Sequence, residues 1–139
     1  EAVRIADRLT RPFPAGLLTG AGLLVANAAF ADPALQPDFA RNRYHGAVAW
    51  SWQQALLAAG IDRQLVRGDL TPSARKTLGQ ARTRLAAAMQ ASTAVRGSEL
   101  WSWSQHAGRY RVEPFGQRRE DETESNAAQL WSTVYLAQP

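Results

Sequence analysis

The sequence predicts a mainly α-helical domain of 139 residues with one short β-hairpin near residues 99–113. Three observations support this fold class. Residues 72–95 carry apolar side chains at helical spacing, residues 44–59 are apolar with almost no charge, and a turn signal separates two aromatic and β-branched runs. With 45% hydrophobic residues, the chain is long enough to bury a core as one domain, residues 1–139.

Residues 2–10 are expected to form a short amphipathic helix. The run Arg11-Pro12-Phe13-Pro14 ends it, because proline is incompatible with the helix interior and disfavours helix in the residue before it. Gly, Pro, Asn and Asp are frequent in the segment that follows, so residues 11–43 are expected to be mostly loop. A loop of this length is usually functional or contains an unrecognised element.

Residues 44–59 are expected to form an inner helix, since a helix that is apolar nearly all round is normally surrounded by other helices. Gly60 is expected to end it. Trp50 and Trp52 would then lie about 200° apart around the helix axis. They would face opposite directions and could not both contact one ligand.

Residues 72–95 are expected to form an outer helix that pairs with the inner one. Thr71 is a typical N-cap residue and Pro72 suits the first helical position. The predicted buried stripe comprises Ala74, Leu78, Ala81, Leu85, Ala88 and Val95. The basic side chains off this stripe predict a solvated face made of Arg75, Lys76, Arg82 and Arg84.

The run Gln105-His106-Ala107-Gly108 predicts the turn of a β-hairpin with strands over 99–104 and 108–113. On such a strand Trp101 and Trp103 share a face, because side chains alternate between the two faces of a sheet. A last helix is expected to begin near Asn126, with Gln129 as a capping partner.

Composition argues against several classes of partner. The net charge is +4, yet the 16 basic residues, all arginine except Lys76, form no compact run, so nucleic acid is not expected. No run reaches the roughly 18 to 20 apolar residues of a membrane span. Cysteine is absent and the two histidines are far apart, so no metal and no cofactor are expected. Nothing in the sequence indicates a compartment.

Aromatic, His and Arg side chains are concentrated in residues 41–54, and residues 98–103 combine two tryptophans with Glu99. Residues 126–132 add Trp131. Aromatic rings cover the apolar face of a pyranose while nearby polar groups bind its hydroxyls. These segments therefore predict carbohydrate as a partner.

The run Tyr44-His45-Gly46-Ala47-Val48-Ala49-Trp50 resembles the segment that opens an inner helix in the six-hairpin, (α/α)6-barrel glycosidases, which include the glycogen-debranching amylo-α-1,6-glucosidases. Ser98-Glu99-Leu100, followed by Gln129-Leu130-Trp131-Ser132, is similar to the end of those barrels. The resemblance implies helical hairpins that form part of an (α/α)6 toroid. The chain would be its C-terminal third, associating with the remainder of the barrel or with itself through exposed apolar faces.

The activity implied by the resemblance is inverting hydrolysis of glucoside-type oligosaccharides, with Glu99 as general base. Glu124, just before the last helix, is the alternative base. The implied substrate-binding residues are Tyr44, His45, Trp50, Trp101 and Trp103. No segment matches the family's general acid, and because the reaction needs two positioned carboxyl groups, the isolated chain is expected to be inactive.

Each of these residues also has a structural interpretation. Glu99 could be a surface carboxylate beside Arg96, His45 could be a buried histidine bonded to a backbone carbonyl, and the tryptophans could be core. The acidic residues 120–124 are most simply a solvated loop. Two further functions stay open: a non-catalytic carbohydrate-binding or remnant domain, and a helical protein-interaction domain.

Overall fold

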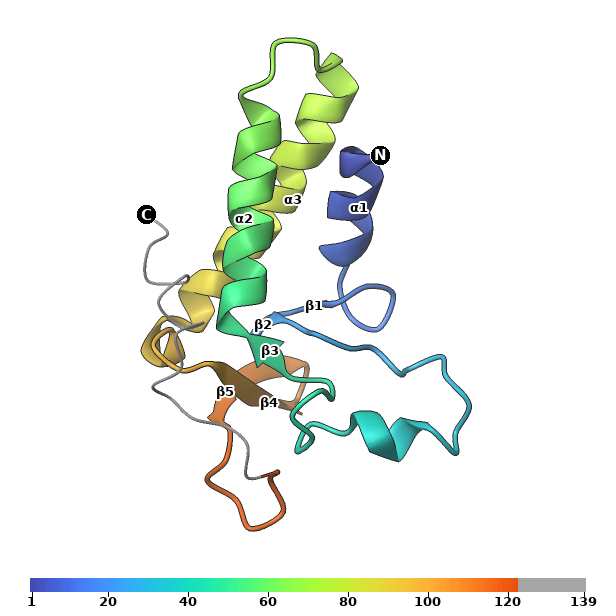
Figure 1. The fold of residues 1–139 in the computed structure, drawn as a ribbon, viewed down its shortest axis with the longest axis vertical. Coiled ribbons are helices and arrows are strands. Elements are labelled where there is room, and N and C mark those ends of the chain that lie inside the picture. The colour runs from blue at the N-terminus through green and yellow to red at the C-terminus, as the bar shows by residue number, and fades with distance from the viewer. Residues whose placement is uncertain (123–139) are drawn as a thin grey trace.

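The computed structural model describes residues 1–122 of the chain. In this part, three α-helices stand on two small antiparallel sheets (Figure 1). About 41% of the described residues are helical and 17% are in strands. The prediction of a mainly α-helical domain is therefore correct only in part, because the described fold is mixed α/β. The predicted closing helix near Asn126, with Trp131, and the alternative base Glu124 lie outside the described residues.

The first helix, α1 (Ala2–Leu9), confirms the predicted one. The strands β1 (Leu18–Thr19) and β2 (Gly22–Leu23) then pair antiparallel, and a short 3-10 helix, η1, spans Gln36–Phe39. Apart from isolated β-bridges at Pro12 and Leu24, the rest of residues 11–43 is turns and irregular chain.

The helix α2 (Ser51–Leu65) begins later than predicted and continues through Gly60. Residues 49–50 are not helical, because they form strand β3 (Ala49–Trp50) and pair with a strand far away in the sequence. Gly60 costs a helix only about 1 kcal/mol. The burial of Ile61 directly after it offsets that cost.

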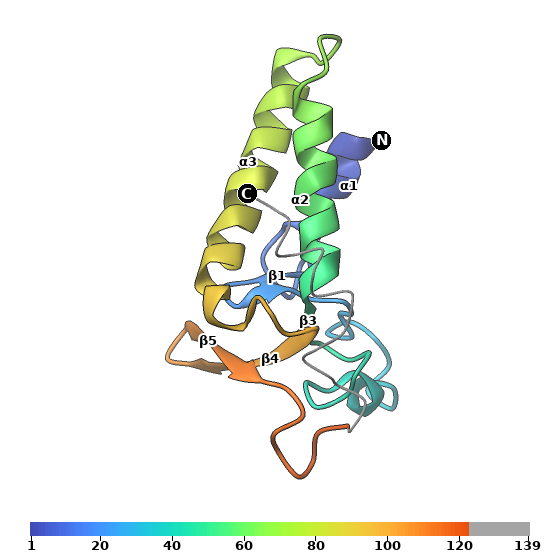
Figure 2. The same ribbon diagram turned by 60° about the vertical axis from the view of Figure 1, so that its left-hand side comes forward.

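The helix α3 (Pro72–Ala91) lies alongside α2 in both views, followed by the 3-10 helix η2 (Thr93–Val95) (Figures 1 and 2). The predicted N-cap is confirmed, since Thr71 Oγ1 accepts a 3.2 Å hydrogen bond from the backbone N–H of Ala74. The centre of the predicted stripe is buried: Leu78, Ala81, Leu85 and Ala88.

The prediction of a wholly solvated basic face on α3 is wrong for two of its residues. Arg82 Nε donates a 2.8 Å hydrogen bond to Asp62 on α2. Arg84 Nη2 donates a 3.1 Å hydrogen bond to the Thr10 hydroxyl, at the end of α1. These half-buried arginines attach α3 to both other helices.

The predicted β-hairpin is confirmed. Strands β4 (Leu100–His106) and β5 (Arg109–Pro114) pair antiparallel, and β3 pairs with the other edge of β4. Ala107 and Gly108, the two turn residues, both have positive φ angles, of 48° and 78°. A two-residue hairpin turn of type I′ has this geometry, which matches the twist of the strands.

Helix packing and aromatic packing occupy different parts of the molecule. The helices enclose an aliphatic core that includes Ile61, Leu78 and Leu85. The aromatic residues gather around the three-stranded sheet, in clusters centred on Trp50 and Trp103. In Figure 2 this sheet lies below the α2–α3 helix pair. The candidate site residues therefore lie at the sheet end of the fold.

Some large apolar side chains are exposed in the described part of the chain: Ile5, Phe30, Leu35, Phe39, Leu56 and Val66. Over residues 1–122, no helix has both the length and the apolar character needed to cross a membrane.

Candidate functional site

Glu99 is buried, with 2% of its surface exposed, immediately before strand β4. Its carbonyl oxygen accepts hydrogen bonds from both the backbone N–H (2.9 Å) and the hydroxyl (3.0 Å) of Ser51, the first residue of α2. The start of α2 therefore holds the backbone of Glu99 in place. The interpretation of Glu99 as a surface carboxylate beside Arg96 is wrong.

Only one of the two oxygens of the Glu99 carboxylate accepts a hydrogen bond from the described residues. The Tyr44 hydroxyl donates a 2.6 Å hydrogen bond to Glu99 Oε1. Glu99 Oε2 is buried and accepts no hydrogen bond in the described part of the protein. Buried polar atoms without a partner are rare and cost stability, so each one calls for a functional or structural reason.

Aromatic rings surround Tyr44. Its ring centre lies 4.9 Å from that of His45 and 5.0 Å from that of Trp50, both in edge-to-face geometry. The indole N–H of Trp50 donates a 3.1 Å hydrogen bond to the Tyr44 carbonyl oxygen, which fixes the two residues together. His45 is exposed above this cluster, so its interpretation as a buried histidine is wrong.

Trp50 and Trp52 do not face opposite directions. Their ring centres are 6.0 Å apart in an edge-to-face contact. The prediction failed because it placed both residues on one helix, whereas Trp50 belongs to β3 and Trp52 to α2. The change from strand to helix between them brings both rings to the same side.

Glu122 holds the irregular segment that contains Arg43 and Tyr44, a role that its place in an acidic run did not indicate. Its Oε2 accepts a 2.6 Å hydrogen bond from the backbone N–H of Tyr44, and its Oε1 pairs with Arg43 at 3.1 Å. The Tyr44 N–H, followed by the Arg43 guanidinium, lowers the pKa of Glu122. Asp121 is buried, so the interpretation of residues 120–124 as a solvated loop is wrong for this residue, whereas Glu122 is partly exposed.

Trp101 and Trp103 are built into the fold. Trp101 is fully buried and its indole N–H donates a 2.7 Å hydrogen bond to the Ala21 carbonyl, so it has no exposed face on which a sugar could stack. Trp103 is 8% exposed, and its N–H donates a 2.8 Å hydrogen bond to the Ala47 carbonyl. Trp50 is buried to the same extent as Trp103, at 8% exposed, so of the predicted substrate-binding residues only His45, which is exposed, and Tyr44, which is half-buried, present surface near Glu99.

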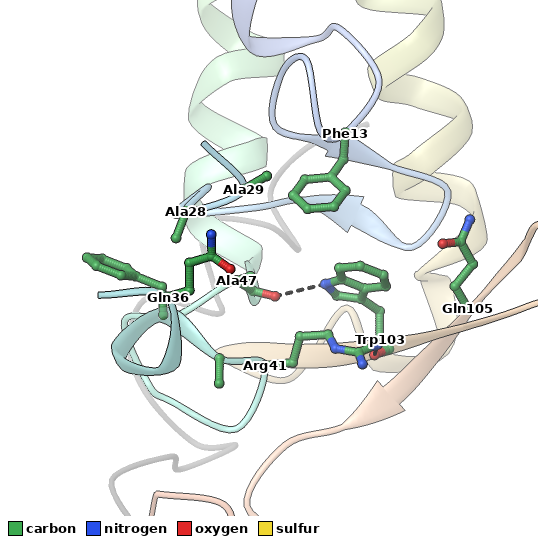
Figure 3. A pocket seen from close by; sticks show the side chains of 10 residues that line it. Phe13, Ala28, Ala29, Gln36, Arg41, Ala47, Trp103 and Gln105 are labelled. Carbon is green, nitrogen blue, oxygen red and sulfur yellow. Dashed lines mark hydrogen bonds between the residues drawn. The ribbon is translucent and has the colours of Figure 1, made fainter. Parts of the chain in front are cut away.

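Trp103 forms one wall of a cavity of about 460 Å³, shown in Figure 3. We call it the Arg41 cavity; its lining residues are Phe13, Ala28, Ala29, Gln36, Phe39, Ala40, Arg41, Ala47, Trp103 and Gln105. Sequence reasoning missed this cavity. Its only signal was the presence of Arg41 and Phe39 in a long irregular segment.

Within residues 1–122, no group of three or more His, Asp or Glu side chains is arranged to hold a metal ion. Comparisons of the chain with protein families, with curated proteins and with solved structures found no match. The geometry itself therefore defines the candidate site: a buried carboxylate with one engaged oxygen, next to a cluster of aromatic rings.

Proposed function

We propose that this chain supplies the general base and part of the aromatic wall of an inverting glycoside hydrolase that acts on glucoside-type oligosaccharides. Glu99 is the base. The observation that carries the proposal is Glu99 Oε2, a buried carboxylate oxygen that accepts no hydrogen bond from the described residues.

The two oxygens of Glu99 suit different tasks. Oε1 is oriented by the Tyr44 hydroxyl, and the backbone is held by Ser51, so the carboxylate is positioned before substrate arrives. Oε2 is left to accept a proton. In an inverting glycosidase this acceptor activates the water that attacks the sugar from the face opposite the leaving group.

The exposed ring of His45 forms the substrate side of the proposal, with the rings of Tyr44 and Trp50 packed behind it. His45 is exposed and lies 5.3 Å from Trp50, with a tilt of 34° between the rings. An exposed ring backed by other rings suits the apolar face of a pyranose. The general acid must stand roughly 6.5 to 9.5 Å from the base, and the proposal takes it from another hairpin of the same barrel.

The test uses the gene product that contains residues 1–139, assayed on aryl glucosides and α-linked oligosaccharides. Glu99→Gln should lower kcat by about 10² to 10⁴, because the variant cannot take a proton. Glu120→Gln, an exposed carboxylate in the same chain, is the control and should leave kcat unchanged. For Glu99→Ala, added azide should restore turnover and give a glycosyl azide of inverted configuration. Full activity in Glu99→Gln would remove Glu99 from the mechanism.

A second candidate is a helical protein-interaction domain whose tryptophans serve only as core. The burial of Trp101 and Trp103, each with its indole N–H bonded to a backbone carbonyl, favours it. In that case Glu99→Gln would change stability without changing glucoside turnover. Measuring both glucoside turnover and unfolding stability of Glu99→Gln therefore separates the two functions.

A further inference from the structure

The Arg41 cavity is distinct from the Glu99 site and has its own chemistry. Most residues in its lining are apolar, and Arg41 is the one charged residue among those described there. Gln36 and Gln105 add amide groups. In Figure 3, Phe13 lies on one side of Trp103 and Arg41 on the other, while Ala28, Ala29 and Gln36 lie across the cavity. The cavity thus combines apolar walls with a single positive charge.

Arg41 is held in one position by Trp103. Its guanidinium carbon lies 4.7 Å from the centre of the Trp103 ring, and Nη1 donates a 3.0 Å hydrogen bond to the Trp103 carbonyl oxygen. Its own carbonyl oxygen accepts a 2.8 Å hydrogen bond from the Ser102 hydroxyl. A guanidinium fixed in this way presents its remaining N–H groups with little loss of side-chain entropy, and their planar fork matches a carboxylate.

Trp103 itself is not a free stacking platform. Arg41 covers its ring, and Phe13 and Tyr110 approach it with ring centres at 5.7 Å and 5.4 Å. Its indole N–H is already bonded to Ala47. A pyranose has hydroxyls all around its ring, and this lining offers too few donors and acceptors for them. An apolar ring with one acidic group makes a better match.

We propose that the Arg41 cavity binds a small organic carboxylate with an aromatic or alicyclic body. The body packs against Phe13, Phe39 and the alanines, and the carboxylate pairs with the Arg41 guanidinium. The volume of about 460 Å³ falls within the usual range for small-molecule sites. This inference does not depend on the role of Glu99.

The first test is a titration of the 139-residue chain followed by two-dimensional ¹H–¹⁵N NMR, with the indole N–H of Trp103 and the Nε–H of Arg41 as local probes. Phenylacetate is expected to bind with a Kd of about 1 mM or lower. Phenylacetamide lacks the charge and acetate lacks the ring, so each should bind at least about tenfold more weakly. Equal affinity for the acid and the amide, or no saturable shift at these probes, would overturn the proposal.

The second test changes Arg41. Arg41→Gln should weaken phenylacetate binding at least about tenfold. Arg41→Lys keeps the charge, so its affinity for phenylacetate should lie between those of the wild type and Arg41→Gln. Arg63→Gln, an exposed arginine on α2, is the matched control and should bind like the wild type. The Trp103 indole resonance reports whether each variant keeps the cavity. Wild-type affinity in a folded Arg41→Gln would refute the proposal, and if that variant does not fold, the acid–amide comparison decides.

Discussion

The hydroxyl of Tyr44 donates a 2.6 Å hydrogen bond to the buried carboxylate of Glu99, across 55 positions of sequence. The two residues come from different connections, one before β3 and the other between η2 and β4. Their contact joins the irregular chain around Tyr44, before β3, to the start of β4, the central strand of the three-stranded sheet. It also orients the carboxylate to which we assign the base role.

Removing this hydroxyl should destabilise the fold. Tyr44→Phe leaves the ring contacts with His45 and Trp50 and removes one donor to a buried carboxylate, at an expected cost of about 1 to 3 kcal/mol. Tyr110→Phe, which removes a hydroxyl from a half-buried ring in the same sheet, is the control and should cost less than about 0.5 kcal/mol. Urea unfolding measures both. If the two variants lose the same free energy of unfolding, the hydrogen bond from Tyr44 to Glu99 makes no specific contribution to stability.

The same change should have opposite effects at two glycines. Gly22 has a φ of 143°, and an added Cβ would lie 2.8 Å from the Ala49 Cβ, so Gly22→Ala should destabilise by more than about 1 kcal/mol. Gly60 lies inside α2 with no atom within 4 Å of an added Cβ. Gly60→Ala should stabilise by about 0.5 to 1 kcal/mol. Thermal unfolding of the two variants checks the pair, and a loss of stability in Gly60→Ala would contradict the position of that residue inside α2.

The N-cap of α3 should be worth about 1 kcal/mol, because Thr71 satisfies a backbone N–H that has no partner within the helix. Thr71→Ala should lower the free energy of unfolding by that amount. Ser73→Ala, an exposed position two residues further on, should change it by less than about 0.5 kcal/mol. Urea unfolding at neutral pH compares them, and a larger loss in Ser73→Ala would place the start of the helix elsewhere.

Glu122 should make stability depend on pH. Its pKa is lowered in the fold by the Tyr44 N–H and by Arg43, so its contribution is present above the unfolded pKa of about 4.3 and is lost as the pH falls through the folded value. Glu122→Gln should therefore be less stable than the wild type at pH 7, and the difference should be smaller at pH 2.5. Urea midpoints at the two pH values measure this. Glu120→Gln, with an exposed side chain, should match the wild type at both, and a Glu122→Gln deficit that is equally large in acid would refute the charge-based explanation.

Local signals in the sequence predicted the elements that depend on neighbouring residues. The prolines after α1, the Thr71-Pro72 start of α3 and the Ala107-Gly108 turn each act within a few positions of the chain. Backbone sterics and capping hydrogen bonds operate over that distance, so these elements appear close to where they were predicted.

The start of α2 could not be predicted in the same way. Residues 44–50 have the apolar composition of a buried helix, yet Ala49 and Trp50 pair with Trp101 and Leu100. A short apolar run fits a buried strand as well as a buried helix, and only the distant partner decides between them. Because residues 49 and 50 form a strand, the rings of Trp50 and Trp52 lie on the same side instead of facing opposite directions.

The sequence by itself thus determined the helical hairpin, the β-hairpin and the identity of Glu99 and Tyr44 as residues of interest. Only the tertiary structure decided that these two residues touch, that Trp101 is core, and that Arg41 stacks on Trp103 beside a cavity. The physical reason is one of range. A helix or turn is stabilised by bonds between neighbours in the chain, whereas these contacts join residues more than 50 positions apart and exist only once the helices and the sheet have packed.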